Sequence, residues 1–296
     1  DDYVIPLEKL GREKALSVGS KSAQLGEMKS GLGLQVPEGF AISAWAYKYF
    51  MDTNNLQELI SEKIGSVDIK HYDDLVRISE EIQHMIVSCP VPEDLEQDIQ
   101  KNYDELATRL PSEGFAVRSS AIGEDTLFSF AGQYSTYLNI RGDQLIDRYR
   151  DVLASKFSPK AIYYLLSHTL SESDHAMSVC CITMDNAKTS GGIYTRDPVR
   201  PEEDCLLINS IYGLGKYLVD GTLMPDVFRV SRKEKTVQEF QLAKKTVRLV
   251  IQTGEGTIEE KVPDSEQELA SISDAQVGLL ADIALKIENH YGYPQD

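Results

Sequence analysis

The sequence predicts an α+β protein, with helices dominating the first part of the chain and strands the second. Between residues 75 and 110, apolar residues recur at spacings of three and four, which is typical of amphipathic helices. From residue 176 onward, short runs rich in Val, Ile and Thr alternate with Gly, Asn and Asp turns, as in strands. Because these two kinds of segment follow one another, we expect two parts, residues 1–175 and 176–296.

Helices are expected through most of the first part. One covers residues 21–30 after a Gly19-Ser20 turn, and a short strand at 36–43 precedes a helix capped by Ser43. The apolar face over residues 75–86 predicts a helix ended by Cys89-Pro90, and Pro92 starts the next one. Two further helices are expected over residues 143–156 and 159–171.

The second part is expected to contain five strands and a final helix that starts near Ser273. The strands are predicted at residues 176–184, 192–195, 205–209, 227–230 and 247–252. In the first of them, strand alternation sends the thiols of Cys180 and Cys181 to opposite faces. None of the four cysteines has the spacing of a redox or zinc pair, so we interpret them as reduced residues of the core in a cytoplasmic protein.

The net charge of the chain disfavours anionic partners. The 296 residues carry 47 acidic and 30 basic side chains, a net charge of −17, which disfavours binding to nucleic acid or to an anionic membrane. No apolar run approaches the roughly 20 residues that cross a bilayer, and the acidic start is not that of a signal peptide. The missing initiator Met indicates that residues precede Asp1 in the natural protein.

The segment from Phe115 to Gln133 is the most informative part of the chain. Its β-prone start delivers Arg118 and the hydroxyls of Ser119 and Ser120 into a loop that Gly123 and Gly132 bound. An arginine fork, flanking hydroxyls and loop amides all donate to anionic oxygens, so this pattern predicts polyphosphate binding. Taken alone, Arg118 is equally consistent with a surface ion pair at the end of a strand.

Lys21 is the second candidate cation. It lies just inside a predicted helix N-terminus, where the helix dipole already favours anions, so it would hold transferable phosphates. The alternative is an ordinary solvated lysine. The chain has no P-loop, no complete dinucleotide fingerprint and no eukaryotic kinase signature, so an ATP site here belongs to another architecture.

Several motifs occur in a fixed order along nearly the whole chain. They are Val18-Gly-Ser-Lys-Ser-Ala-Gln-Leu-Gly-Glu-Met28, Val36-Pro-Glu-Gly-Phe-Ala-Ile-Ser43, Phe115-Ala-Val-Arg-Ser-Ser-Ala121, Phe130-Ala-Gly-Gln133, Ser190-Gly-Gly-Ile-Tyr-Thr-Arg-Asp-Pro198, Tyr212-Gly-Leu-Gly215, Pro225-Asp226 and His290-Tyr-Gly-Tyr-Pro-Gln-Asp296. Together they closely resemble the nucleotide-binding domain of the phosphoenolpyruvate synthase and pyruvate phosphate dikinase family. The resemblance implies an ATP-grasp-like fold, two subdomains clamping ATP and Mg²⁺ in a cleft.

The resemblance also implies a reaction, in which this domain passes phosphate from ATP to a histidine on a separate swivelling domain that then visits a pyruvate-type barrel. It implies that Lys21 and Arg118 grip the phosphates, with Gly132, Thr136 and Tyr137 approaching the nucleotide. A half-buried strand aromatic is the alternative for Tyr137. Two further motif segments contain acidic residues. The pair Glu124-Asp125 either helps to order the loop or a metal ion or is merely exposed, and Asp197-Pro198 is expected to close a strand-end turn.

Some positions depart from the family pattern. In relatives, Pro-Gln-Asp continues into Ile-Glu-Trp, so Asp296 is expected to bind Mg²⁺ without its partner carboxylate, and this segment alone to be impaired or inactive. None of the five histidines has the sequence context of a phosphate acceptor. Ser20 replaces a glycine, and Ile182 stands about where relatives have a glutamine that faces the nucleotide. Two alternatives therefore stay open, a rifampin-phosphotransferase-like kinase and a non-catalytic nucleotide-sensing module.

Overall fold

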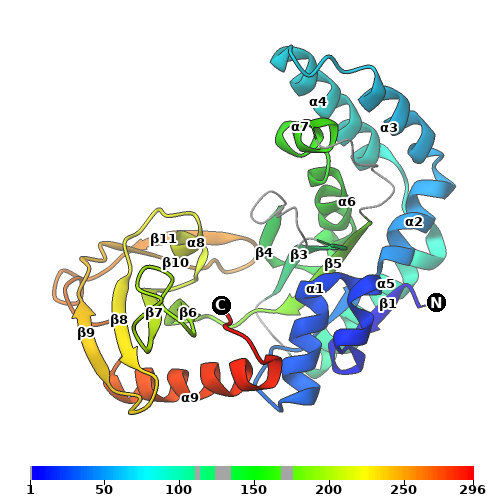
Figure 1. Ribbon diagram of the computed structural model, residues 1–296. Helices are drawn as coiled ribbons and strands as arrows, with labels where there is room; N and C mark the ends of the chain where they lie inside the picture. The colour runs from blue at the N-terminus through cyan, green and yellow to red at the C-terminus, as the bar shows by residue number, and fades with distance from the viewer. Residues whose placement is uncertain (1, 111–113, 124–134, 168–175) are drawn as a thin grey trace. The chain divides into compact units, whose positions relative to one another are not determined.

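The computed structural model describes residues 2–110, 114–123, 135–167 and 176–296 (Figure 1). The chain divides into two compact units, Asp1–Met184 and Asp185–Asp296. Both units combine helices with antiparallel sheet, which confirms the predicted α+β class.

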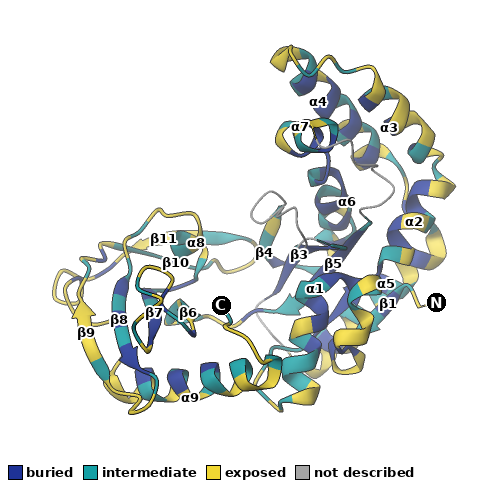
Figure 2. Cartoon of the chain, viewed as in Figure 1, coloured by how far each residue is buried: buried dark blue, intermediate teal, exposed yellow. Residues whose placement is uncertain are grey.

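The first unit is built on a five-stranded sheet with the strand order β1-β2-β5-β3-β4. Every pairing in this sheet is antiparallel. The strands are β1 (Val4–Pro6), β2 (Gly39–Ile42), β3 (Phe115–Ala121), β4 (Thr136–Ile140) and β5 (Met177–Thr183). The central strands β3 and β5 are almost entirely buried, and Figure 2 colours them accordingly.

Two separate cores cover the faces of this sheet. The larger core lies between one face and the helices α2 (Ala44–Thr53), α3 (Leu56–Gly65), α4 (Tyr72–Ser88), α5 (Glu93–Arg109), α6 (Leu145–Ser155) and α7 (Pro159–Ser167). The smaller core packs α1 (Ala15–Gly26) and the 3₁₀ turn η1 (Leu7–Lys9) against Ala41 and Cys180. In Figure 1, β3 and β5 accordingly lie between α1 and α6. Shorter helical turns complete the unit: η2 (Arg12–Lys14), the π-helix η3 (Glu27–Gly31) and η4 (Gly142–Gln144).

The boundary expected near residue 175 moves to the end of β5. This strand was assigned to the second part because strands follow it in the sequence. It instead pairs with β2 on one side and with β3 on the other, and so completes the first sheet. The division after Met184 follows from these long-range pairings, which local composition does not reveal.

The second unit contains the four-stranded antiparallel sheet β6-β7-β8-β9 and one long helix. The strands are β6 (Thr189–Tyr194), β7 (Cys205–Tyr212), β8 (Asp226–Ser231) and β9 (Val237–Gln241). Helix α9 (Asp274–Tyr291) buries Val277, Ala281 and Ala284 against one face of this sheet. A short helix α8 (Lys216–Val219) and the hairpin β10 (Val247–Ile251)–β11 (Thr257–Lys261) complete the unit.

Local signals predicted the starts of two helices, although α3 was not expected. Ser43 caps α2 by accepting from the amide of Ala46 at 3.4 Å, and Ser273 caps α9 through a reciprocal pair with Gln276. The strand predictions were less complete, since β1, β9 and β11 were not expected. Most residues of β9 and β11 are exposed, so these two strands lack the apolar alternation that marks a strand.

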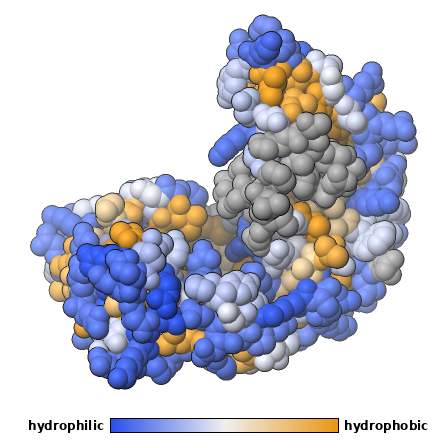
Figure 3. All heavy atoms as spheres, viewed as in Figure 1, coloured by the Kyte–Doolittle hydropathy of each residue, from blue (hydrophilic) through white to orange (hydrophobic). Residues whose placement is uncertain are grey.

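The surface in view is mainly hydrophilic (Figure 3), in keeping with the net charge of −17. Within the described ranges, no helix is both long and apolar enough to cross a membrane.

Candidate functional site

A kink in α1 sets the geometry of the first candidate segment. Gly19 has φ 74° and ψ 161°, a backbone conformation that almost only glycine adopts, and it interrupts the helix. A Cβ built on Gly19 would lie 2.1 Å from the carbonyl oxygen of Ser120. Gly19 is therefore needed both for its backbone angles and for the close approach of strand β3. The helix resumes at Ser20 and places Lys21 in its first turn.

Ser120 connects this kink to the strand that carries Arg118. Its hydroxyl donates to the carbonyl oxygen of Val18 at 2.7 Å and accepts from the amide of Ser22 at 3.1 Å. Ser120 is completely buried. The two segments that the sequence singled out, about one hundred residues apart, are thus joined by hydrogen bonds on the α1 face of the first sheet.

Arg118 lies on the same face as Ser120, because residues two apart in a strand share a face. It stands opposite Thr136 on β4 and opposite Cys180 on β5, and its side chain is half-buried. None of the ion pairs that join residues of the described ranges involves Arg118. The surface ion pair that was its alternative assignment is therefore not formed with any residue the structure describes.

The thiol of Cys180 lies close to both candidate cations. Burial raises the pKa of Cys180, while the positive charges of Arg118 and Lys21 act on it in the opposite direction. The Ser22 side chain faces the same sulfur, although its hydroxyl has no hydrogen-bond partner of normal geometry among the described atoms. Arg118 stands opposite Cys180, and α1, which carries Lys21, packs against the same residue, so both cations belong to segments on one face of the sheet.

The remaining residues of this segment separate by strand alternation. Thr136 is exposed and shares the face of Arg118. Tyr137 is paired with Val117 on the opposite face, where it packs against the large core and the Arg148 guanidinium lies 5.2 Å from its ring centre. Tyr137 is therefore a half-buried strand aromatic, as its alternative assignment has it, and its contact with the nucleotide stays a prediction.

The hydroxyls beside Arg118 are also not placed as expected. Arg118, Ser119 and Ser120 belong to β3 rather than to a loop. Ser119 is buried and faces the side opposite Arg118, and the single proton of the Ser120 hydroxyl goes to Val18. The Ser120 hydroxyl is therefore not available to donate to a phosphate, and Ser119 does not share the face of Arg118. Gly132, Glu124 and Asp125 lie outside the described residues.

Two sequence motifs also meet in the second unit. The amide of Thr195 donates to the carbonyl oxygen of Gln295 at 2.8 Å, and the amide of Gln295 donates to Thr195 Oγ1 at 2.7 Å. Asp296, the expected metal ligand, follows this contact and is exposed. In the part of the chain that the structure describes, no group of three or more His, Cys, Asp or Glu side chains could hold a metal ion. The described residues alone thus do not make a metal site around Asp296.

Other acidic residues of these motifs have structural roles. Asp197 accepts from the amides of Val199 and Arg200 and from the Arg229 guanidinium at 2.6 Å, so it closes the strand-end turn as predicted. Burial tends to raise the pKa of Asp197, and these hydrogen bonds outweigh it and lower that pKa. Asp226 forms a fully buried ion pair with Lys245 at 2.6 Å.

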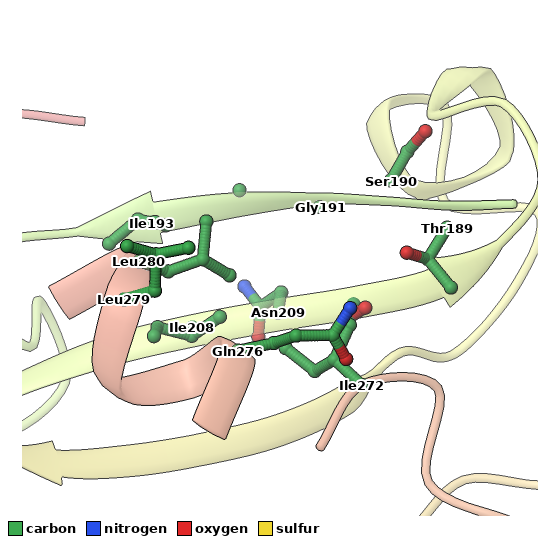
Figure 4. Close-up of a pocket in the computed structure, with 12 residues that line it drawn as sticks. Thr189, Ser190, Gly191, Ile193, Ile208, Asn209, Ile272, Gln276, Leu279 and Leu280 are labelled. Carbon is green, nitrogen blue, oxygen red and sulfur yellow. The ribbon is translucent and has the colours of Figure 1, made fainter. Parts of the chain in front are cut away.

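A pocket of about 290 Å³ lies within the second unit, between β6, β7 and the start of α9 (Figure 4). Figure 4 shows apolar side chains from α9, such as Leu279 and Leu280, near Ile193 and Ile208 of the sheet. The lining contains no charged side chain. It therefore lacks the cations that a triphosphate needs. The start of the motif at residues 190–198 lines it, but none of the predicted phosphate, nucleotide or metal ligands does.

Sequence reasoning missed the part that Ser120 and Cys180 play around the two cations. Gly19 offered one indication, since a glycine at a helix start cannot supply the side-chain oxygen that usually caps it. The partner that supplies this oxygen lies about one hundred residues away and could not be read from local pattern.

The comparisons with known proteins agree on one family. Residues 15–296 match a family described as pyruvate phosphate dikinase, AMP/ATP-binding domain. The chain is 34% identical over 298 residues to a probable phosphoenolpyruvate synthase of Methanothermobacter thermautotrophicus, covering 99% of this chain and 43% of that protein. It is 33% identical over 314 residues to a phosphoenolpyruvate synthase of Neisseria meningitidis, covering 100% of this chain and 40% of that protein. The chain thus spans about two fifths of the length of these curated relatives.

Proposed function

This chain belongs to the family of pyruvate phosphate dikinase AMP/ATP-binding domains, and from this premise we propose that it is the ATP-binding phosphotransferase domain of a phosphoenolpyruvate-synthase-like enzyme. The triphosphate binds on the α1 face of the first sheet, between Lys21 and Arg118. The domain then passes a phosphoryl group to a histidine of a swivelling domain that lies elsewhere. In the full enzyme, pyruvate, ATP and water become phosphoenolpyruvate, AMP and phosphate.

One observation carries this proposal: two buried hydrogen bonds of Ser120 join the Lys21 segment to the strand that holds Arg118. In a chain with a net charge of −17, two cations gathered on one sheet face form a local exception. Such a local positive site attracts a polyphosphate even where the overall field repels anions.

Phosphoryl transfer depends mainly on positioning and on neutralising charge, so the domain needs no protein nucleophile. The Arg118 guanidinium would hold phosphate oxygens in a bidentate fork, and the Lys21 ammonium would follow the transferred group as a point charge. Thr136 presents a hydroxyl on the same face. Cys180 takes no covalent part, because burial raises the pKa of its thiol and keeps it protonated.

The finer architecture is part of the proposal. The two units correspond to the two subdomains of an ATP-grasp fold, and Gly132, which lies outside the described residues, stays an expected nucleotide contact. Asp296 contributes one carboxylate to the Mg²⁺ that accompanies ATP. When bound, this ion would neutralise phosphate charge. Since the described residues supply no complete set of ligands, no step of the reaction is assigned to it.

Calorimetry with Mg-ATP on the full natural chain tests this proposal. Each of Lys21→Ala and Arg118→Ala removes a hydrogen bond to a charged oxygen and is expected to weaken binding by about 10- to 100-fold. Lys63→Ala and Arg77→Ala serve as matched controls, because both cations pair with Glu81 on the helical side of the unit. Unchanged affinity in both site variants would refute the proposed site.

One observation keeps a nucleotide-sensing role as a second candidate. Ile182 lies on the α1 face and packs against the smaller core, so it offers no hydrogen bond to a base. Transfer of ³²P from [β-³²P]ATP to a supplied histidine domain distinguishes these functions. Tight binding of Mg-ATP without any transfer would favour sensing, and transfer to an antibiotic instead would favour the rifampin-type kinase.

A further inference from the structure

We propose that Ser120 is a positioning residue, whose hydroxyl sets the place of Lys21 relative to Arg118. This inference rests on the proposed function of the same face. It differs from the expectation drawn from the sequence, in which the hydroxyl itself donates to phosphate.

The hydroxyl of Ser120 acts as the N-cap of the part of α1 that follows the kink. The residue before a helix normally places its own side-chain oxygen on an amide of the first turn. Gly19 occupies that position and has no side chain, so the amide of Ser22 would lack a partner. Ser120 supplies the missing acceptor from strand β3, at 3.1 Å.

A second hydrogen bond fixes the other side of the kink. The same oxygen donates to the carbonyl of Val18 at 2.7 Å, so one atom holds the backbone just before Gly19 and just after Lys21. The position of Lys21 is therefore set from both sides. Because Arg118 is two residues from Ser120 along one strand, the spacing between the two cations depends on this one contact.

The surroundings of the Ser120 hydroxyl are buried and closely packed, so no other group can take its place. Ser120, Val18 and Gly19 are buried. The carbonyl of Ser120 also lies where a Cβ on Gly19 would be, 2.1 Å away. Removing the hydroxyl would thus leave the Ser22 amide and the Val18 carbonyl without this partner, and the kink would be free to shift.

Ser120→Ala removes both hydrogen bonds and is the main variant. Its control is Ser178→Ala, since Ser178 is a buried serine of the neighbouring strand, stands opposite Ser120, and donates to Ile42 rather than to α1. Ser120→Cys, which keeps a weak donor and acceptor, is expected to lie between wild type and alanine. It also keeps the test valid if the alanine variant is poorly folded.

The first measurement needs no nucleotide. In the full chain without ATP, the amide of Ser22 is expected to exchange with deuterium at least about fivefold faster in Ser120→Ala, and at the wild-type rate in Ser178→Ala. Equal exchange in wild type and Ser120→Ala would overturn the inference.

The second measurement is a double-mutant cycle on Mg-ATP affinity. Ser120→Ala is expected to weaken binding by about tenfold in the wild-type background and by less than about threefold when Lys21→Ala is already present. A purely structural role would give equal losses in the two backgrounds and would overturn the inference. If Lys21→Ala and Arg118→Ala themselves leave binding unchanged, the proposed function is wrong and the positioning role falls with it. If they weaken binding while Ser120→Ala does not, only the positioning role is wrong.

Discussion

Replacing Gly19 by alanine tests the structural basis of the site most directly. At φ 74° and ψ 161°, any other residue is strained by about 1–3 kcal/mol. The added methyl would also lie 2.1 Å from a backbone oxygen that has no flexible side chain to move aside. Overlap of this kind typically costs about 1–3 kcal/mol more. Gly19→Ala is therefore expected to lower the free energy of unfolding by about 2–6 kcal/mol.

Urea denaturation of the full chain measures this loss, and two glycines of the same unit provide controls. Gly33 also has a positive φ, 63°, but nothing lies within 4 Å of the position its Cβ would take. Gly33→Ala should thus show only the backbone cost, about 1–2 kcal/mol. Gly65 ends helix α3 in open space, and its replacement should be neutral or slightly stabilising. If Gly19→Ala is no more destabilising than Gly33→Ala, the inference that β3 approaches the kink too closely for a side chain is wrong.

Three further predictions concern stability. Lys245→Ala leaves Asp226 charged in a fully buried place and is expected to cost about 3–5 kcal/mol in urea denaturation, whereas a loss below about 1 kcal/mol would contradict the buried pair. The hydrogen bond from the Arg232 guanidinium holds the pKa of Glu288 below the usual 4.5. This pair therefore stabilises the fold above about pH 4.5, and its contribution to the free energy of unfolding is lost as pH falls through the lowered pKa. Glu288→Gln should accordingly reduce the fall in unfolding free energy between about pH 6 and pH 3; an unchanged pH profile would argue against the pair. Ser43→Ala removes the cap of α2 and should lower the free energy of unfolding by about 1 kcal/mol in the same assay.

Rules that act over a few residues predicted much of the fold. The caps at Ser43 and Ser273 and the end of α4 at Cys89 follow from side-chain chemistry within one turn. The opposite orientation of Cys180 and Cys181 follows from strand alternation, and the two thiols indeed belong to different cores. In each case the deciding contact lies close in sequence.

Pairings between distant segments could not be predicted in this way. Strand β5 reads as the first of a series of strands, yet its partners are β2 and β3. Alternation likewise separates Thr136 from Tyr137 but does not tell which of them faces α1. That depends on the register with β3, which places Tyr137 opposite Val117. Local residue chemistry singled out Lys21 and Arg118, and the resemblance to a known family assigned both to the phosphates, while the part played by Ser120 depends on coordinates.

The central place of β5 also bears on how this polypeptide acquires its structure during synthesis. The ribosome releases β1 and β2 early and β3 and β4 much later. These two antiparallel pairs are joined into one sheet only when β5 inserts between them. Residue 183 must therefore emerge before the sheet can close, and contacts of such long sequence separation form slowly. Until then both pairs expose open edges, and such edges are prone to pair with other chains.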